Sequence, residues 1–119
     1  MPLRRKKYAG GSGKDLEMVN IGAAETGIRT EVIEEIRNIA RRCGTERVIL
    51  FGSRARGDFK RTSDIDLAVC GGDFTCFAID VEEETSTLLE FDFVDMSRDV
   101  QKELLEIIQK EGLVLYEKI

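Results

Sequence analysis

The chain contains no histidine among its 119 residues. This absence excludes catalytic mechanisms built on a Ser–His or Cys–His pair, and it removes the most common zinc ligand. No apolar run approaches the roughly 20 residues that a helix needs to cross a bilayer. The basic cluster Arg4–Lys7 is followed by Tyr-Ala-Gly-Gly-Ser-Gly rather than by an apolar segment, so a secretory signal is not expected.

Cysteine is scarce and odd in number. Cys43, Cys70 and Cys76 show no Cys-x-x-Cys spacing, so we expect neither a disulfide framework nor a structural zinc site. Free thiols fit a reducing compartment, which favours a cytoplasmic location. Cys43 and Cys70 lie in apolar stretches and are expected to act as small core residues.

Charge is distributed unevenly along the chain, whose net charge is -5. Residues 1–29 hold six basic and three acidic side chains, whereas residues 30–119 hold 12 and 20. The stretch Gly10–Gly13 is typical of a flexible linker. We therefore expect residues 1–29 to form a flexible basic arm and residues 30–119 to form one acidic domain. Because such a domain repels a phosphate backbone, nucleic acid is not an expected partner, and neither is a membrane.

The spacing of apolar residues predicts helices alternating with strands. The predicted helices are residues 30–43, a short turn from Ser53 through Arg56, residues 73–89 and about 98–111, and the predicted strands are Val48–Phe51, Ile65–Val69, Phe91–Val94 and Leu113–Tyr116. Thr30, Ser53 and Ser97 are the expected N-caps. This order predicts an α/β domain in which helices pack on a small sheet.

The first candidate site is Gly52-Ser53, which ends a predicted strand and opens a helix. Glycine lets the backbone approach a ligand closely, and the first amides of a helix suit a phosphate. Arg54 and Arg56 add positive charge nearby. Taken alone, the same residues fit a capped turn with solvent-facing arginines.

The second candidate feature is Asp64-Ile65-Asp66, which enters a predicted strand. Side chains alternate along a strand, so the two carboxylates share one face and repel each other. A hard divalent cation such as magnesium compensates this repulsion best. Taken alone, the same pattern fits solvated acids at the end of a loop.

Asp92 is the third candidate, an acid placed between Phe91 and Phe93 in an apolar strand. The two rings are expected to face the core, so Asp92 points the other way, where it needs water or a metal. If this strand lies beside residues 65–69, Asp92 joins the two upstream aspartates to form a two-metal site next to the glycine–serine turn. Asp95 has the opposite parity and is expected to be a surface or capping residue.

Together these segments resemble the minimal nucleotidyltransferase (MNT) family, part of the DNA polymerase beta-like nucleotidyltransferase superfamily. The segments are Gly52-Ser53-Arg54-Ala55-Arg56-Gly57, Ser63-Asp64-Ile65-Asp66-Leu67 and Phe91-Asp92-Phe93-Val94. The resemblance covers about residues 30–119, with an atypical loop at residues 58–62. It implies a polymerase beta-like fold with a small mixed sheet flanked by helices, and transfer of a nucleoside monophosphate to a hydroxyl.

The resemblance also implies a role for each site residue. Asp64 and Asp66 would bind both magnesium ions, and Asp92 would bind the ion that activates the attacking hydroxyl. Gly52 and Ser53 would hold the β- and γ-phosphates of ATP.

Two arginines follow in the same motif. Arg54 would contact the triphosphate, whereas Arg56 would brace the turn.

The family is similar to the antitoxin half of HEPN–MNT toxin–antitoxin pairs, which implies transfer of AMP from ATP to a tyrosine of a HEPN toxin. Two alternatives remain open: a non-catalytic antitoxin that masks its partner, and a small-molecule (antibiotic) nucleotidyltransferase. A template-free polymerase acting on RNA ends fits the acidic domain least. The sequence leaves the acceptor, the base and the oligomeric state open.

Overall fold

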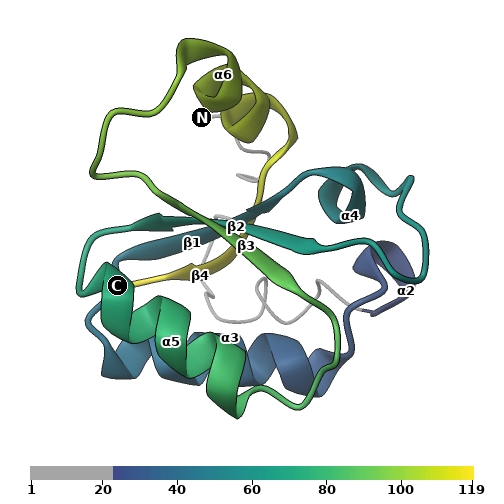
Figure 1. The fold of residues 1–119 in the computed structure, drawn as a ribbon, viewed down its shortest axis with the longest axis horizontal. Helices are drawn as coiled ribbons and strands as arrows, with labels where there is room; N and C mark the ends of the chain where they lie inside the picture. Colours follow the sequence, from purple (N-terminus) through teal and green to yellow (C-terminus); the bar gives the residue numbers. More distant parts are fainter. Residues whose placement is uncertain (1–22) are drawn as a thin grey trace.

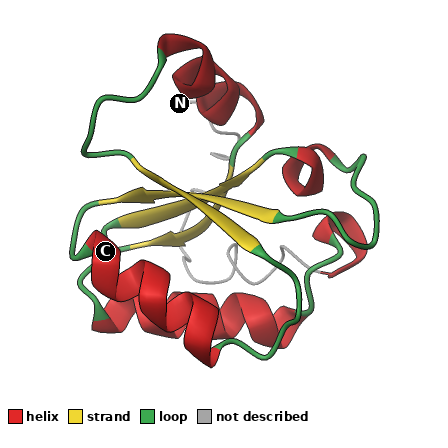
Figure 2. Cartoon of the chain, in the orientation of Figure 1, coloured by secondary structure: helices red, strands yellow, loops and turns green. Residues whose placement is uncertain are grey.

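A computed structural model describes residues 23–119 of the chain, so the basic cluster and the glycine-rich stretch of the expected arm lie outside the described residues. Helices and strands alternate as the sequence predicts (Figure 2). The elements are α2 (Ala23–Thr26), α3 (Thr30–Arg42), β1 (Arg47–Phe51), α4 (Ser53–Arg56), β2 (Ile65–Cys70), α5 (Phe74–Glu84), β3 (Phe91–Asp95), α6 (Lys102–Glu111) and β4 (Leu113–Glu117). No helix among the described residues is long and apolar enough to span a membrane.

The four strands form one mixed sheet in the order β3-β2-β1-β4. β1 pairs antiparallel with β2 and β4, whereas β2 and β3 run parallel. Parallel neighbours need a crossover connection, and α5 supplies it. The fold predicted from the sequence, a small mixed sheet flanked by helices, is therefore confirmed.

The helices divide between the two faces of the sheet (Figure 1). α3 and α5 cover one face, and α6 covers the other. Alternate residues of β2 follow this division: Ile65, Leu67 and Val69 belong to the larger core beneath α3 and α5, and Ala68 belongs to the smaller core beneath α6. Asp66 has the same parity as Ala68, so its carboxylate lies on the α6 side of the sheet.

The larger core contains the apolar stripe of α3 and a group of aromatic rings. The buried residues of α3 recur at helical spacing: Val32, Ile33, Ile36, Ile39 and Ala40. Phe91 stacks on Phe93, and Phe74 and Phe77 meet Phe93 edge to face. These rings pack against the core from the β3 side, as the alternation of β3 predicts.

None of the three residues expected to be an N-cap is the N-cap in the structure. Thr30 and Ser53 are the first residues of their helices, after Arg29 and Gly52. Ser97 lies in a turn, where its amide and hydroxyl donate to Asp95, and α6 begins only at Lys102. For Ser97 the reason is local competition, because a serine two residues after an aspartate closes a turn instead of starting a helix.

The end of the expected arm is structured. Residues 23–26 form α2, and Thr26 and Ile28 are buried, Ile28 within the larger core. The folded part of the chain therefore begins before residue 30, because Ile28 supplies core surface that the charge distribution does not reveal.

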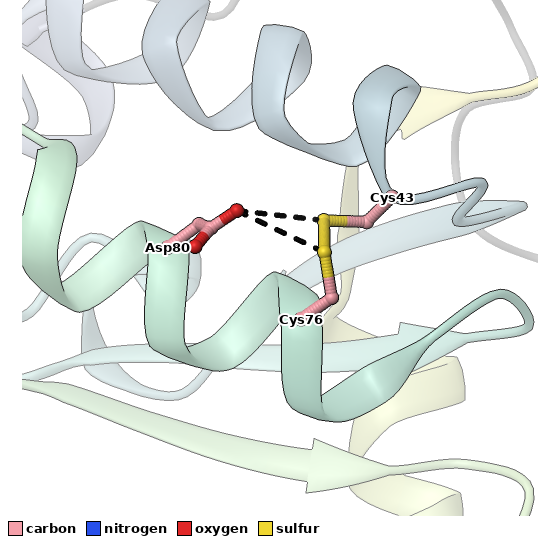
Figure 3. A group of neighbouring side chains, drawn as sticks. All are labelled: Cys43, Cys76 and Asp80. Carbon is pink, nitrogen blue, oxygen red and sulfur yellow. Dashed lines mark hydrogen bonds between the residues drawn. A yellow bond between two sulfur atoms is a disulfide. The ribbon is translucent and has the colours of Figure 1, made fainter.

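Two of the three cysteines form a disulfide, which corrects the expectation of free thiols. Cys43 follows α3, Cys76 lies in the first turn of α5, and their Cα atoms are 6.0 Å apart (Figure 3). Only Cys70 is free among the described residues. The odd count and wide spacing gave no signal, because the pairing depends on how α3 packs against α5. The inference of a cytoplasmic location from free thiols therefore loses its basis.

Candidate active site

The glycine–serine turn connects β1 to α4 through an unusual backbone conformation. Gly52 has φ +81°, in the left-handed region that favours glycine. A Cβ added at Gly52 would overlap Oδ2 of Asp66. The turn and this carboxylate are therefore in direct van der Waals contact, and Ser53 beside them is half-exposed. Glycine is required here both for its backbone angle and for the close approach of the acid.

The structure brings the three predicted acids together on one face of the sheet. Asp66 and Asp92 are register partners across the parallel β2–β3 pair. Asp64 precedes β2 by one residue and has the same parity as Asp66. Asp64 and Asp92 are exposed, whereas Asp66 is half-buried between them and the turn. The cluster thus opens to solvent on the side where a ligand would enter.

The electrostatics of this cluster are unfavourable in the absence of a cation. The pKa of Asp66 is raised to about 6, first by burial and then by the charges of Asp92 and Asp64, in that order of importance. Arg56 acts in the opposite direction. A half-buried carboxylate beside two other carboxylates is a site at which a bound cation lowers the energy of the ionised state.

These residues fit a magnesium site by the chemistry of their donors. Three carboxylates supply hard oxygen ligands, which Mg²⁺ prefers, and their exposed side leaves room for water and for the oxygens of a phosphate. The charge of Arg56 does not offset the burial and the neighbouring acids that raise the pKa of Asp66. Asp95, as expected, lies outside it and binds Ser97.

Arg54 differs from its expected role at the triphosphate. Its side chain is buried, only 1% exposed, and its guanidinium donates to the carbonyl oxygens of four residues. Those residues are Thr26, Lys60, Arg61 and Ser63. The guanidinium also lies over the ring of Phe59, 4.9 Å from its centroid. Arg54 therefore ties α2 and the loop before β2 to α4, and a phosphate cannot reach it without breaking these bonds.

Arg56 is the cation that faces the site. Its side chain is exposed, and it pairs with Asp58 and Glu111, each at 3.2 Å. Its charge also stabilises ionised Asp66. The sequence assigned Arg54 to the triphosphate and Arg56 to the turn, whereas the structure buries the first side chain and exposes the second. One turn of helix places the two side chains in opposite environments, and four residues are too few for an apolar period to reveal this.

Exchanging the two arginines for methionine separates these roles. Arg54→Met leaves several buried carbonyls without a donor, so we expect it to lower the free energy of unfolding by about 3 kcal/mol or more. Arg56→Met removes two exposed ion pairs and should cost less than about 1 kcal/mol. Urea denaturation of both variants measures the difference. Equal losses would contradict the assignment of Arg54 to the framework.

The raised pKa of Asp66 predicts a pH-dependent stability in the metal-free protein. A carboxyl whose folded pKa exceeds its unfolded value stabilises the fold while it is protonated, and this contribution disappears as the pH rises through about 6. Relative to wild type, Asp66→Asn should therefore gain stability as the pH rises from 3.8 to about 6, and should keep a constant advantage at higher pH. Urea denaturation in a chelating buffer measures this, with Glu83→Gln on α5 as the control. A stability difference independent of pH would refute the electrostatic account of this cluster.

A surface hollow at the opposite ends of β2 and β3 includes none of the three acids. Its lining includes Gly72, Phe74, Phe93 and Arg98. The hollow lies near the start of α5, whereas the acids lie where β2 and β3 begin. The candidate active site, formed by the three acids and the glycine–serine turn, therefore lies on the α6 side of the sheet and not in this hollow.

Comparison with known proteins agrees with this geometry. The family model described as "Polymerase beta, Nucleotidyltransferase" matches residues 34–119. Among solved structures, a toxin–antitoxin with AMP-PNP is 22% identical, with a TM-score of 0.56 over 72% of this chain and 73% of that one. A mutant of the toxin–antitoxin MntA–HpeT is 20% identical, with a TM-score of 0.55 over the same shares. The comparison with curated proteins found no match. These structures share the fold, and the family match covers most of the chain, motifs included: the chain belongs to the polymerase beta nucleotidyltransferase family and is a nucleotidyltransferase.

Proposed function

We propose that the chain transfers AMP from ATP, with magnesium, to a tyrosine hydroxyl of a partner HEPN toxin and so acts as its antitoxin. The observation that carries the proposed chemistry is the contact of Asp66 with the glycine of the turn, together with its register pairing with Asp92. This contact supports the proposal, because one triphosphate could reach both the carboxylates and the glycine–serine turn.

Each site residue has a distinct part in the proposed reaction. Asp64 and Asp66 would hold both cations, and Asp92 the one nearer the acceptor. Gly52 and Ser53 would hold the β- and γ-phosphates. Bound magnesium would supply a lowered pKa for the acceptor hydroxyl and charge stabilisation for the leaving group.

The transfer itself is a single displacement at phosphorus. The acceptor oxygen attacks the α-phosphorus in line, and the bond to the β-phosphate oxygen breaks and releases pyrophosphate. Asp92 would accept the proton of the hydroxyl, and its exposure beside the other two acids supports this role. Arg56 adds positive charge on the side of the turn, where the leaving phosphates would lie.

The structural neighbours support the partner by analogy. Both are toxin–antitoxin structures, one of them holding an ATP analogue. The mutant of the second carries aspartate-to-glutamate replacements at two positions separated by one residue, the same spacing as Asp64 and Asp66.

Incubation with α-labelled ATP, magnesium and the protein encoded by the neighbouring gene tests the proposal. We expect covalent label on a tyrosine of the partner, located by peptide mass spectrometry. Tight binding of the partner without covalent label would contradict the proposed transfer and favour a non-catalytic antitoxin that masks its partner. Label on an added aminoglycoside but not on the partner would indicate a small-molecule transferase instead.

A further inference from the structure

The disulfide lies beside the carboxylate of Asp80, which takes no part in the proposed reaction. Asp80 lies one helical turn after Cys76 on α5, and its carboxylate points at both sulfurs (Figure 3). Oδ2 is 3.9 Å from Sγ of Cys43 and 3.8 Å from Sγ of Cys76. One oxygen and two sulfurs, from α5 and from the residue that follows α3, thus lie within 4.8 Å of one another.

The positions of these atoms suit a soft divalent cation once the sulfurs are separated. Ligands of one tetrahedral Zn²⁺ lie about 3.5–3.8 Å apart, as follows from metal–ligand bonds of about 2.0–2.3 Å. The Asp80 oxygen lies 3.9 and 3.8 Å from the two sulfurs, at or just beyond the upper end of that range, so a small movement would bring it to the ligand spacing. In the disulfide the sulfurs are bonded to each other and cannot act as thiolates. Reduction releases them to a nonbonded separation, which is also the spacing that a shared metal requires.

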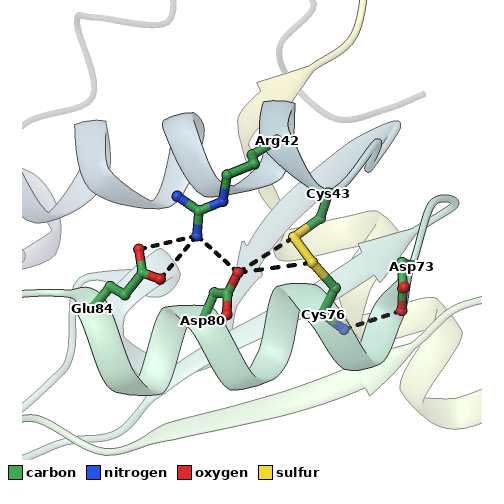
Figure 4. Close-up of a disulfide and its surroundings, with 6 residues drawn as sticks. All are labelled: Arg42, Cys43, Asp73, Cys76, Asp80 and Glu84. Carbon is green, nitrogen blue, oxygen red and sulfur yellow. Dashed lines mark hydrogen bonds and ion pairs between the residues drawn. A yellow bond between two sulfur atoms is a disulfide. The ribbon is translucent and has the colours of Figure 1, made fainter.

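The residues around Asp80 would allow its carboxylate to turn from Arg42 to a metal. Arg42 donates to Asp80 at 2.8 Å and to Glu84 at 3.0 Å, so Glu84 can keep Arg42 if Asp80 turns toward a metal (Figure 4). The amide of Cys76 donates to Asp73, which fixes the first turn of α5. Cys76 and Asp80 are half-exposed, so an ion can enter.

We propose that Cys43, Cys76 and Asp80 form a binding site for a thiolate-preferring divalent cation, with Zn²⁺ as the best fit, which disulfide formation closes. A dithiol reductant transfers two electrons and two protons to the disulfide and leaves two thiols. Metal binding releases those two protons and forms two metal–sulfur bonds and one metal–oxygen bond, with water in the fourth position. A two-electron thiol oxidant restores the disulfide and releases the cation.

This site is separate from the acidic cluster. It joins α3 to α5, which cover the face of the sheet opposite α6 (Figure 1). Asp66 lies on the α6 side. The two sites also differ in ligand chemistry, since sulfur selects zinc and carboxylates select magnesium. A zinc measurement can therefore be made in a chain whose magnesium site has been disabled.

The test uses the full chain carrying Asp66→Asn, reduced with a phosphine under anaerobic conditions. Equilibrium dialysis against Zn²⁺ with metal analysis gives the stoichiometry, and Co²⁺ substitution reports thiolate ligation through its charge-transfer absorption. We expect one zinc per reduced chain and none per oxidised chain. The control is Cys70→Ser, which removes the thiol outside the cluster. It should bind zinc as tightly as the chain without this substitution.

Two further variants keep the proposal falsifiable. Cys76→Ser should lose the site, and Asp80→Asn, which keeps both thiols, should weaken zinc binding by about tenfold or more. Absence of zinc from the reduced chain would overturn the proposal. So would binding that is unchanged by Asp80→Asn and Cys76→Ser, or Co²⁺ spectra without thiolate charge transfer.

Discussion

Asp66→Asn is expected to reduce nucleotidyl transfer by about 10³-fold or more while the variant folds at least as stably as wild type. The rate falls because the central carboxylate of the cluster is lost where charge develops during transfer. Stability does not fall, because the same change removes a half-buried charge that faces Asp64 and Asp92. Initial rates of pyrophosphate release, with the partner as acceptor, measure the first effect.

The matched control is Asp95→Asn, an acid at the end of the neighbouring strand β3 whose carboxylate binds Ser97 outside the cluster. We expect this variant to retain a rate within severalfold of wild type. A wild-type transfer rate in Asp66→Asn would contradict the assignment of Asp66 to the active site. An equal loss of transfer rate in Asp95→Asn would contradict it as well. A loss of activity accompanied by unfolding would also contradict the expected gain in stability.

The second large effect is the loss of stability when the disulfide is reduced. Cys43 and Cys76 are 33 residues apart, and opening a loop of that length should lower the free energy of unfolding by about 4 kcal/mol. For a domain of this size the melting temperature should fall by about 15–30 °C. Calorimetry with and without a phosphine reductant, in a metal chelator, measures the shift.

Cys70→Ser serves as the control for this experiment, because it removes the free thiol and leaves the disulfide intact. It should respond to reductant as wild type does. Melting that is insensitive to reductant would contradict the stabilising role of the bond. The transfer rate per folded molecule should survive reduction, since the bond lies beyond the end of β2 opposite the acids.

The sequence was most informative where one short segment determines its own structure. The apolar runs of β1 and β2 and the amphipathic pattern of α3 predict elements that the structure confirms to within one or two residues. The placement of Asp92 opposite the rings of Phe91 and Phe93 follows from strand alternation alone. The meeting of Asp92 with Asp66 needed in addition the assumption that their strands are neighbours.

The sequence was least informative where a residue's role depends on distant parts of the chain. Arg54 is buried because the carbonyls that surround it come from α2 and from the loop before β2. Cys43 meets Cys76 only because α3 packs on α5. Neither environment produces a local sequence pattern. The sequence alone therefore predicts a solvent-facing Arg54 and a free Cys43 thiol.

The most direct test of the proposed site is a crystal structure of the chain with Mn²⁺ in place of Mg²⁺ and a non-hydrolysable ATP analogue, with anomalous scattering used to locate the metal. We expect metal peaks bound by Asp64, Asp66 and Asp92, and the β- and γ-phosphates against Gly52 and Ser53. Metal bound elsewhere, or a nucleotide whose phosphates lie away from the turn, would contradict the account.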